Sequence, residues 1–182
     1  MKDQDEIRLL VKNAQKGDRE SFGKIYDYLI DRIYRFMYFR TGNKEESEDL
    51  TESVFLKAYE KLSTYHDNGL PFEAWVFRIA RNQLVDHYRT KKQSVQLDET
   101  SEIEDKKPNP EDIAEQNIQK QMILQGIRQL PSTYQEIIIF KFIEERENKE
   151  IGLILDKPVE QVRVLQSRAL KALKKVLEWQ KS

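Results

Sequence analysis

The 182-residue chain has no cysteine, only two histidines, six glycines and five prolines. Without cysteine, neither a disulfide framework nor a thiolate nucleophile can form, which fits a reducing cytoplasm. The low glycine and proline content and the 35% share of charged residues predict a largely helical protein. No apolar run approaches the roughly 18 residues of a membrane span, and the N-terminal residues contain no uninterrupted apolar segment. We therefore expect a cytoplasmic protein with no secretory signal and no membrane insertion.

Signatures of catalysis and of cofactor binding are also missing. His66 and His87 have neither an HExxH spacing nor a cysteine pair beside them, so we expect no metal site. The sequence has no phosphate-binding loop, no GxSxG motif and no dinucleotide-binding glycine motif. Its carboxylates lie in polar runs that would not raise a pKa for acid–base work. We predict that the protein is not an enzyme and needs no cofactor; a helical metal-dependent hydrolase would require ligand spacings that are absent.

The formal net charge of −1 conceals two basic segments separated by an acidic one. Residues 72–92 carry a net charge of +3 and residues 157–181 carry +5. Between them, residues 97–116 hold eight acidic residues and two lysines, a net charge of −6. Clustered Lys and Arg bind polyanions, and an acidic segment does not. This distribution therefore indicates two polyanion-binding segments joined by an acidic tether that stays away from the polyanion.

Hydrophobic periodicity predicts an all-α protein of two small domains and no convincing strand. The first domain, residues 1–91, holds helices over residues 3–16, 19–40, 43–62 and 71–89. Residues 92–110 are polar and acidic and predict a flexible linker. The second domain, residues 111–182, holds one helix before Pro131, one capped by Ser132 and running to about Glu145, and two more over residues 149–155 and 158–181. Because only Asp156 and Lys157 separate these last two, they predict a helix-turn-helix.

The helix predicted over residues 71–89 carries a polar stripe beside its apolar faces. Trp75, Arg78, Asn82, Asp86 and Arg89 follow one another at a spacing of three or four residues, which places them on one side. Aromatic rings stack on unpaired bases, and guanidinium groups hold phosphates. The stripe therefore indicates a surface for single-stranded nucleic acid; the alternative is a core helix with a solvated basic edge.

The last predicted helix has an apolar side and, opposite it, a basic side with one apolar residue. Val164 is isolated there beside Arg163 and Arg168, with nothing in its own domain to bury it. In a major groove it could meet a thymine methyl group, while the arginines meet guanine edges or phosphates. This face predicts duplex DNA binding; the alternative is an amphipathic helix with a solvated basic side.

Three stretches resemble bacterial sigma factors, particularly the extracytoplasmic-function group. Residues 48–58, EDLTESVFLKA, and residues 71–82, PFEAWVFRIARN, resemble the second conserved region. Leu130-Pro131 and residues 150–175 resemble the fourth conserved region with its helix-turn-helix. The resemblance spans nearly the whole chain in the right order, and nothing resembles the third domain of larger sigma factors.

This resemblance implies a promoter-specificity subunit whose partners are core RNA polymerase, through its β′ clamp helices and β flap, and promoter DNA. An anti-sigma factor is a further partner of many members of the group. The acidic third helix would dock on the clamp helices around Asp49, Glu52 and Phe55. The loop after it and the next helix would open the −10 element and hold its strand through Asn68, Phe72, Trp75, Arg78, Arg81, Asn82 and Arg89. The last helix would read the −35 element through Arg163, Val164, Ser167, Arg168 and Lys171.

The chain departs from the sigma-factor pattern at two places, and one alternative function remains. Asp156 stands where the family commonly has glycine, and because Asp tolerates a left-handed backbone we expect the turn to be kept. Glu160-Gln161-Val162 replaces the usual Gly-Thr-Val at the start of the recognition helix. The alternative function is a two-domain helix-turn-helix regulator that acts without core polymerase. The acidic third helix and the Trp75 stripe favour the sigma factor, since a simple repressor needs neither.

Overall fold

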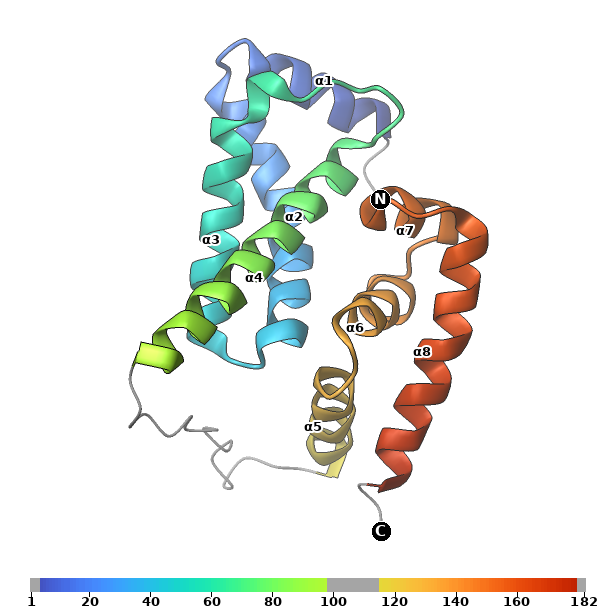
Figure 1. Cartoon of the computed structure of the whole chain (residues 1–182). Coiled ribbons are helices and arrows are strands. Elements are labelled where there is room, and N and C mark those ends of the chain that lie inside the picture. The colour runs from blue at the N-terminus through green and yellow to red at the C-terminus, as the bar shows by residue number, and fades with distance from the viewer. Residues whose placement is uncertain (1–3, 98–114, 180–182) are drawn as a thin grey trace.

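The computed structural model describes residues 4–97 and 115–179, which form two helical domains side by side (Figure 1). The first domain consists of α1 (Gln4–Gln15), α2 (Arg19–Thr41), α3 (Lys44–Glu60), the 3-10 helix η1 (Leu62–Thr64) and α4 (Phe72–Leu97). The second consists of α5 (Glu115–Arg128), α6 (Ser132–Ile138), the π-helical turn η3 (Ile139–Ile143), α7 (Asn148–Leu155) and α8 (Val159–Trp179). No strand occurs within these two ranges. The predicted all-α, two-domain architecture with a C-terminal helix-turn-helix is confirmed.

The region between the domains is described only in part. Helix α4 continues to Leu97, past the predicted domain end at residue 91, and α5 begins at Glu115. Most of the predicted linker at residues 92–110 lies outside the described residues, so its flexibility stays a prediction.

Several helix ends form where the sequence predicts them. The side chains of Asp18 and Asn43 accept hydrogen bonds from backbone N–H groups in the first turns of α2 and α3. Gly42 ends α2 with a left-handed backbone, at φ 68°. At the end of α7, Asp156 adopts φ 54° and ψ 51°, so the turn of the helix-turn-helix is kept without glycine.

The segment after Pro131 differs from the single capped helix that the sequence predicts. Ser132 is the first residue of α6 and Pro131 is its N-cap, so no side chain caps this helix; the Ser132 hydroxyl group instead accepts a hydrogen bond from Arg40 of the first domain at 2.8 Å. Helix α6 ends at Ile138, the π-helical turn follows, and Glu145 has a left-handed backbone at φ 52°. The expected cap is therefore wrong, because the helix begins at Ser132 and the cap position is a proline, whose side chain has no hydrogen-bond acceptor.

The two domains share one apolar core. Phe36 of α2, Phe77 of α4 and Phe140 of η3 are fully buried and contact one another, with ring centroids 5.0 to 5.7 Å apart. Burying a phenylalanine side chain stabilises a fold by about 1.5–3 kcal/mol. Helix α4 packs against α7, and α8 lies along the outer side of the second domain (Figure 1).

Candidate nucleic-acid and polymerase interfaces

The recognition face predicted on α8 is open in the structure. Val162 and Ala169 are fully buried on one side of α8. On the other side Val164 is 49% exposed, so about half of this apolar residue is open to solvent. All five residues predicted for the −35 element are exposed: Arg163, Val164, Ser167, Arg168 and Lys171. The structure therefore brings the predicted −35 set together on one accessible face.

A tight turn fixes α7 against α8. Gly152 of α7 lies so close to the turn that an added Cβ atom would be 2.7 Å from the carbonyl oxygen of Lys157. A side chain at this position would therefore push the recognition helix away from α7. The left-handed Asp156 lies between them and reverses the chain. The sequence identified Asp156 as the turn residue but not Gly152. Gly152 lies inside a helix, and no neighbouring residue in the sequence indicates that a side chain would not fit there.

The loop before α4 borders a cavity of about 350 Å³. Asn68 and Phe72, two of the residues predicted for the −10 element, line it. Trp75 is absent from the lining and packs instead against the rings of Tyr65 and Phe72, with both centroids 5.2 Å away. Trp75 thus supports the loop from behind. Burial, followed by the charge of Asp67, raises the pKa of Tyr65 to about 12, so its hydroxyl group stays protonated and donates to the carbonyl of Leu70 at 2.8 Å.

Helix α1 contributes a wall of this cavity that sequence reasoning missed. Ile7 and Val11 line it, and Arg8 forms an ion pair with Asp67 of the loop at 2.7 Å. Gln15 donates hydrogen bonds to loop carbonyl groups at 2.8 and 2.9 Å. Because Arg8 and Asp67 are 59 residues apart, no local pattern could have revealed this tether.

The residues of α4 that were predicted to contact the −10 element fall into two groups. Asn82 and Arg89 are exposed, and Arg89 pairs with Asp86 at 3.0 Å. Asn82 and Asp86 line a pocket together with Lys57 and Lys61 of the preceding segment. This part of the stripe is accessible to a strand.

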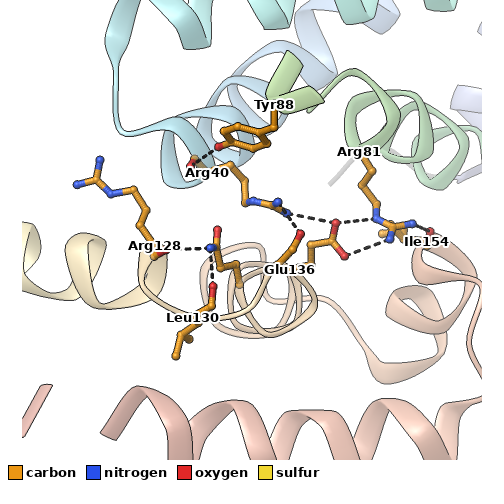
Figure 2. Close-up of polar contacts among 9 residues, drawn as sticks. Arg40, Arg81, Tyr88, Arg128, Leu130, Glu136 and Ile154 are labelled. Carbon is orange, nitrogen blue, oxygen red and sulfur yellow. Dashed lines mark hydrogen bonds and ion pairs between the residues drawn. The ribbon is translucent and has the colours of Figure 1, made fainter. Parts of the chain in front are cut away.

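Arg78 of the stripe and its neighbour Arg81, both predicted for the −10 element, are instead bound by the second domain. Arg78 donates to the carbonyl group of Leu153 at 2.9 and 2.5 Å. Arg81 donates to both carboxylate oxygens of Glu136 at 2.9 and 3.1 Å and to the carbonyl of Ile154 at 3.2 Å (Figure 2). Sequence reasoning placed both arginines on the surface for DNA and did not foresee these partners.

Glu136 lies at the centre of a buried ion cluster between the domains (Figure 2). It is 5% exposed, and besides Arg81 it accepts a hydrogen bond from the guanidinium group of Arg40 at 3.2 Å. Arg40 is 7% exposed, and its carbonyl group accepts a hydrogen bond from Tyr88 at 2.8 Å. Since buried charges need partners, this cluster holds the domains in one arrangement.

A second ion cluster forms around Glu73 at the start of α4. Its carboxylate accepts hydrogen bonds from Arg146 of the second domain and from Arg32 of α2. Burial alone would raise the pKa of Glu73, but the hydrogen bonds and charges of Arg146 and Arg32 outweigh it and lower the pKa. Arg146 also lies over the ring of Phe77, with its guanidinium carbon 5.3 Å from the centroid.

The polymerase-facing residues predicted on α3 differ in exposure. Asp49 and Glu52 are exposed, whereas Phe55 is 4% exposed and packs on Tyr26 with ring centroids 4.7 Å apart. Phe55 therefore supports this face from beneath. Leu56 is 60% exposed and lies one helical turn beyond Glu52, on the same side of α3. Sequence reasoning missed Leu56, although its spacing from Glu52 could have identified it.

Two features are absent from the part of the chain that the structure describes. Within residues 4–97 and 115–179, no three His, Cys, Asp or Glu side chains are grouped as metal ligands would be. Nor does any helix in these ranges combine the length and the apolar character of a membrane span.

Comparisons with known proteins match both domains. Residues 25–94 match the family model for Sigma-70 region 2, and residues 120–173 match the model for Sigma-70 region 4. Over 181 residues the chain is 34% identical to the ECF RNA polymerase sigma factor SigW of Bacillus subtilis, covering 94% of this chain and 96% of SigW. The chain belongs to the extracytoplasmic-function sigma factors. It is also 31% identical over 179 residues to the ECF RNA polymerase sigma factor BldN of Streptomyces coelicolor, covering 96% of this chain and 68% of BldN.

Solved structures share the fold of this sigma factor. CnrH, solved in complex with the cytosolic domain of CnrY, aligns with a TM-score of 0.72 at 20% identity, covering 95% of this chain and 97% of CnrH. The sigma factor RpoE from Bartonella quintana, solved with the anti-sigma factor NepR, aligns with a TM-score of 0.73 at 19% identity, covering 87% of this chain and 98% of RpoE. The family models and the relatives confirm the resemblance to sigma factors, and they do not favour the independent regulator.

Proposed function

We propose that this sigma factor binds core RNA polymerase, brings it to a promoter through the −35 element, and opens the DNA at the −10 element. One observation carries this proposal: each of the two matched sigma regions falls on one domain, and each domain has a basic surface suited to binding DNA. It works as a binding and positioning subunit, and catalysis belongs to the polymerase in the cytoplasm.

In the second domain, the α8 face reads duplex DNA. Arg163 and Arg168 supply guanidinium groups for guanine edges or phosphates, and Val164 supplies an apolar contact for a thymine methyl group. Ser167 and Lys171 extend the contact along the helix toward the backbone. The exposure of all five side chains supports this role.

In the first domain, the cavity beside Asn68 and Phe72 takes an unstacked base, and the α4 stripe holds the strand. Arg78, Arg81, Asn82 and Arg89 contact its phosphates and sugars, while Trp75 keeps the loop in place. On α3, Asp49 and Glu52 meet a basic surface of the polymerase clamp, with Phe55 beneath them and Leu56 as the apolar contact.

An anti-sigma factor is a further proposed partner. Support comes from CnrH and RpoE, which share this fold and were solved in complex with CnrY and with the anti-sigma factor NepR. Such a partner is expected to abolish promoter-specific transcription when added in equimolar amounts.

The test is transcription by core RNA polymerase on a promoter library, with and without this protein. We expect specific transcripts only in its presence, together with binding to core polymerase in the absence of DNA. Binding to core no better than that of an unrelated acidic helical protein would overturn the proposal.

A further inference from the structure

Helix α1 holds the loop before α4 at two points. The side-chain amide of Gln15 donates hydrogen bonds to the carbonyl groups of Leu62 and Tyr65, at 2.9 and 2.8 Å. The guanidinium group of Arg8 donates through Nε to the carboxylate of Asp67 at 2.7 Å. The loop is therefore tied to α1 where it begins and again two residues later.

Contacts within the loop hold its other end. The hydroxyl group of Tyr65 donates to the carbonyl group of Leu70 at 2.8 Å, which brings the two ends of the loop together. The backbone N–H group of Asn68 donates to the carbonyl group of His66 at 2.9 Å. Asn68, which lines the cavity, thus lies between Asp67, tied to α1, and Leu70, tied to Tyr65. These anchors set where Asn68 stands at the cavity.

The tip of the loop has no other support. His66, Asp67 and Asn68 are exposed, and a Cβ atom on Gly69 would meet no heavy atom within 4 Å. Fixing the backbone of even a few loop residues has a substantial entropic cost. Without its anchors the loop would sample many arrangements, and a bound base would have to order it. An anchored loop avoids that cost at the moment of binding.

The same helix that anchors the loop also forms the facing wall of the cavity. Ile7 and Val11, one helical turn apart, line the cavity together with Arg8. Asp5 accepts a hydrogen bond from Nη1 of Arg8 at 3.2 Å, so the guanidinium group is held on both sides. The apolar wall and the loop are therefore held at a fixed separation by the contacts of Arg8 and Gln15.

We infer that Arg8 and Gln15 are positioning residues that set the width of the cavity and thereby the strength of its preference for one base. The inference rests on the proposed capture of an unstacked base beside Asn68 and Phe72. Neither residue has to touch the base, since both act through the loop. A wall that cannot move rejects a base of the wrong size or hydrogen-bonding edge, whereas a loose wall accommodates it.

The first test reads base preference directly. Core RNA polymerase with the full-length chain transcribes a promoter library, and sequencing of the active templates gives the preference at each position. Gln15→Met, which keeps the length of the side chain but removes both donors, should lower the preference at one position of the −10 element about tenfold. Arg8→Ala should lower it about threefold, because exposed ion pairs contribute less. Preferences within the −35 element should stay unchanged.

Two further variants separate positioning from loss of charge or of stability. Arg19→Ala removes an exposed arginine that does not line the cavity, and should leave every base preference unchanged. Arg8→Lys can still pair with Asp67 and should keep more of the preference than Arg8→Ala. Thermal unfolding should give nearly equal Tm values for Arg8→Ala and Arg19→Ala. Equal losses of preference from Arg8→Lys, Arg8→Ala and Arg19→Ala would overturn the inference.

A third measurement removes the base instead of the side chain. In one active promoter from the library, an abasic nucleotide replaces each −10 position of the nontemplate strand in turn. At the captured position this should impair opening by the wild type. On that abasic template Gln15→Met should cause no further defect, since two changes that remove the same interaction are not additive. A full defect of Gln15→Met without the base would show a general structural role and overturn the inference.

The same templates distinguish failure of the inference from failure of the proposed function. If no abasic position impairs the wild type, no base is captured, and the proposed use of the cavity is wrong together with the inference. If one abasic position impairs the wild type but Gln15→Met and Arg8→Ala keep its full base preference, base capture stands and the positioning role is wrong.

Discussion

The two surfaces proposed for DNA differ in what surrounds them in the free chain. The five contact residues of the α8 face are exposed, whereas Arg78 and Arg81 of α4 are bound by oxygens of the second domain. Both surfaces are basic and both lie on long helices. The difference shows that residue type and spacing can identify a DNA surface, but that its availability depends on distant segments packed against it.

The largest expected effect comes from the aromatic contact that only the docked arrangement makes. Phe140→Ala removes a buried ring between Phe36 and Phe77 and should lower the free energy of unfolding by about 3–5 kcal/mol. Phe142, two residues further along the same turn, is 45% exposed, so Phe142→Ala is the matched control. Chemical denaturation of both variants checks this. Equal losses from the two substitutions would mean that the shared core does not form as described.

A second effect concerns the buried ion cluster. Glu136→Gln leaves the buried guanidinium group of Arg40 without its carboxylate, and breaking a buried pair in this way costs about 3–5 kcal/mol. We expect reduced stability together with loss of domain docking, measured by denaturation and by energy transfer between the domains. Glu60→Gln, at an exposed position of α3, is the control and should change neither quantity. A Glu136→Gln variant that stays fully docked would contradict the role given to this cluster.

The third effect separates the two DNA surfaces. Arg168→Ala should weaken duplex binding about tenfold, as loss of one base or phosphate contact does, and leave domain docking intact. Trp75→Ala should spare duplex binding and impair promoter opening, because Trp75 supports the loop through Tyr65 and Phe72. Binding to duplex DNA and permanganate detection of the open promoter measure the two steps. If either substitution impaired both steps equally, the division of labour would be wrong.

The smallest effect is expected at Glu144, which pairs with Arg35 of the first domain at 3.4 Å. Burial raises the pKa of Glu144, and the charges of Arg35 and Arg146 offset this only in part. An acid with a raised pKa destabilises the folded chain when charged, and this penalty disappears as the pH falls through that pKa.

Glu144→Gln should therefore raise Tm by about 1–2 °C at pH 7. The gain should be smaller near pH 4, because the wild-type carboxyl group is then protonated and as neutral as the glutamine. Thermal unfolding at the two pH values checks this prediction. A gain that grows in acid would mean that the ion pair with Arg35, rather than burial, dominates at this position.

Much of the fold could be predicted because its signals are local. Helix starts at Asp18 and Asn43 and the turn at Asp156 depend on residues within a few positions of one another. The α8 face could be predicted for the same reason, since its apolar and basic residues alternate along one helix.

What could not be predicted depends on residues far apart in the chain. Arg40 and Glu136 are 96 residues apart, and Arg146 and Glu73 are 73 apart. No periodic pattern marks such pairs, and each arginine alone is typical of a solvated surface. The contribution of α1 to the cavity and the burial of Phe55 under its acidic neighbours likewise follow from packing between helices.

The most direct test of the comparison is small-angle X-ray scattering from the free wild-type chain and from the Glu136→Gln, Arg146→Gln variant. Packed domains predict a radius of gyration of about 16 Å for the 182-residue wild type, and a clearly larger value for the variant. That result would show that Arg78 and Arg81 are covered in solution while α8 is free. A wild-type radius as large as that of the variant would contradict the account, because both DNA surfaces would then be equally available.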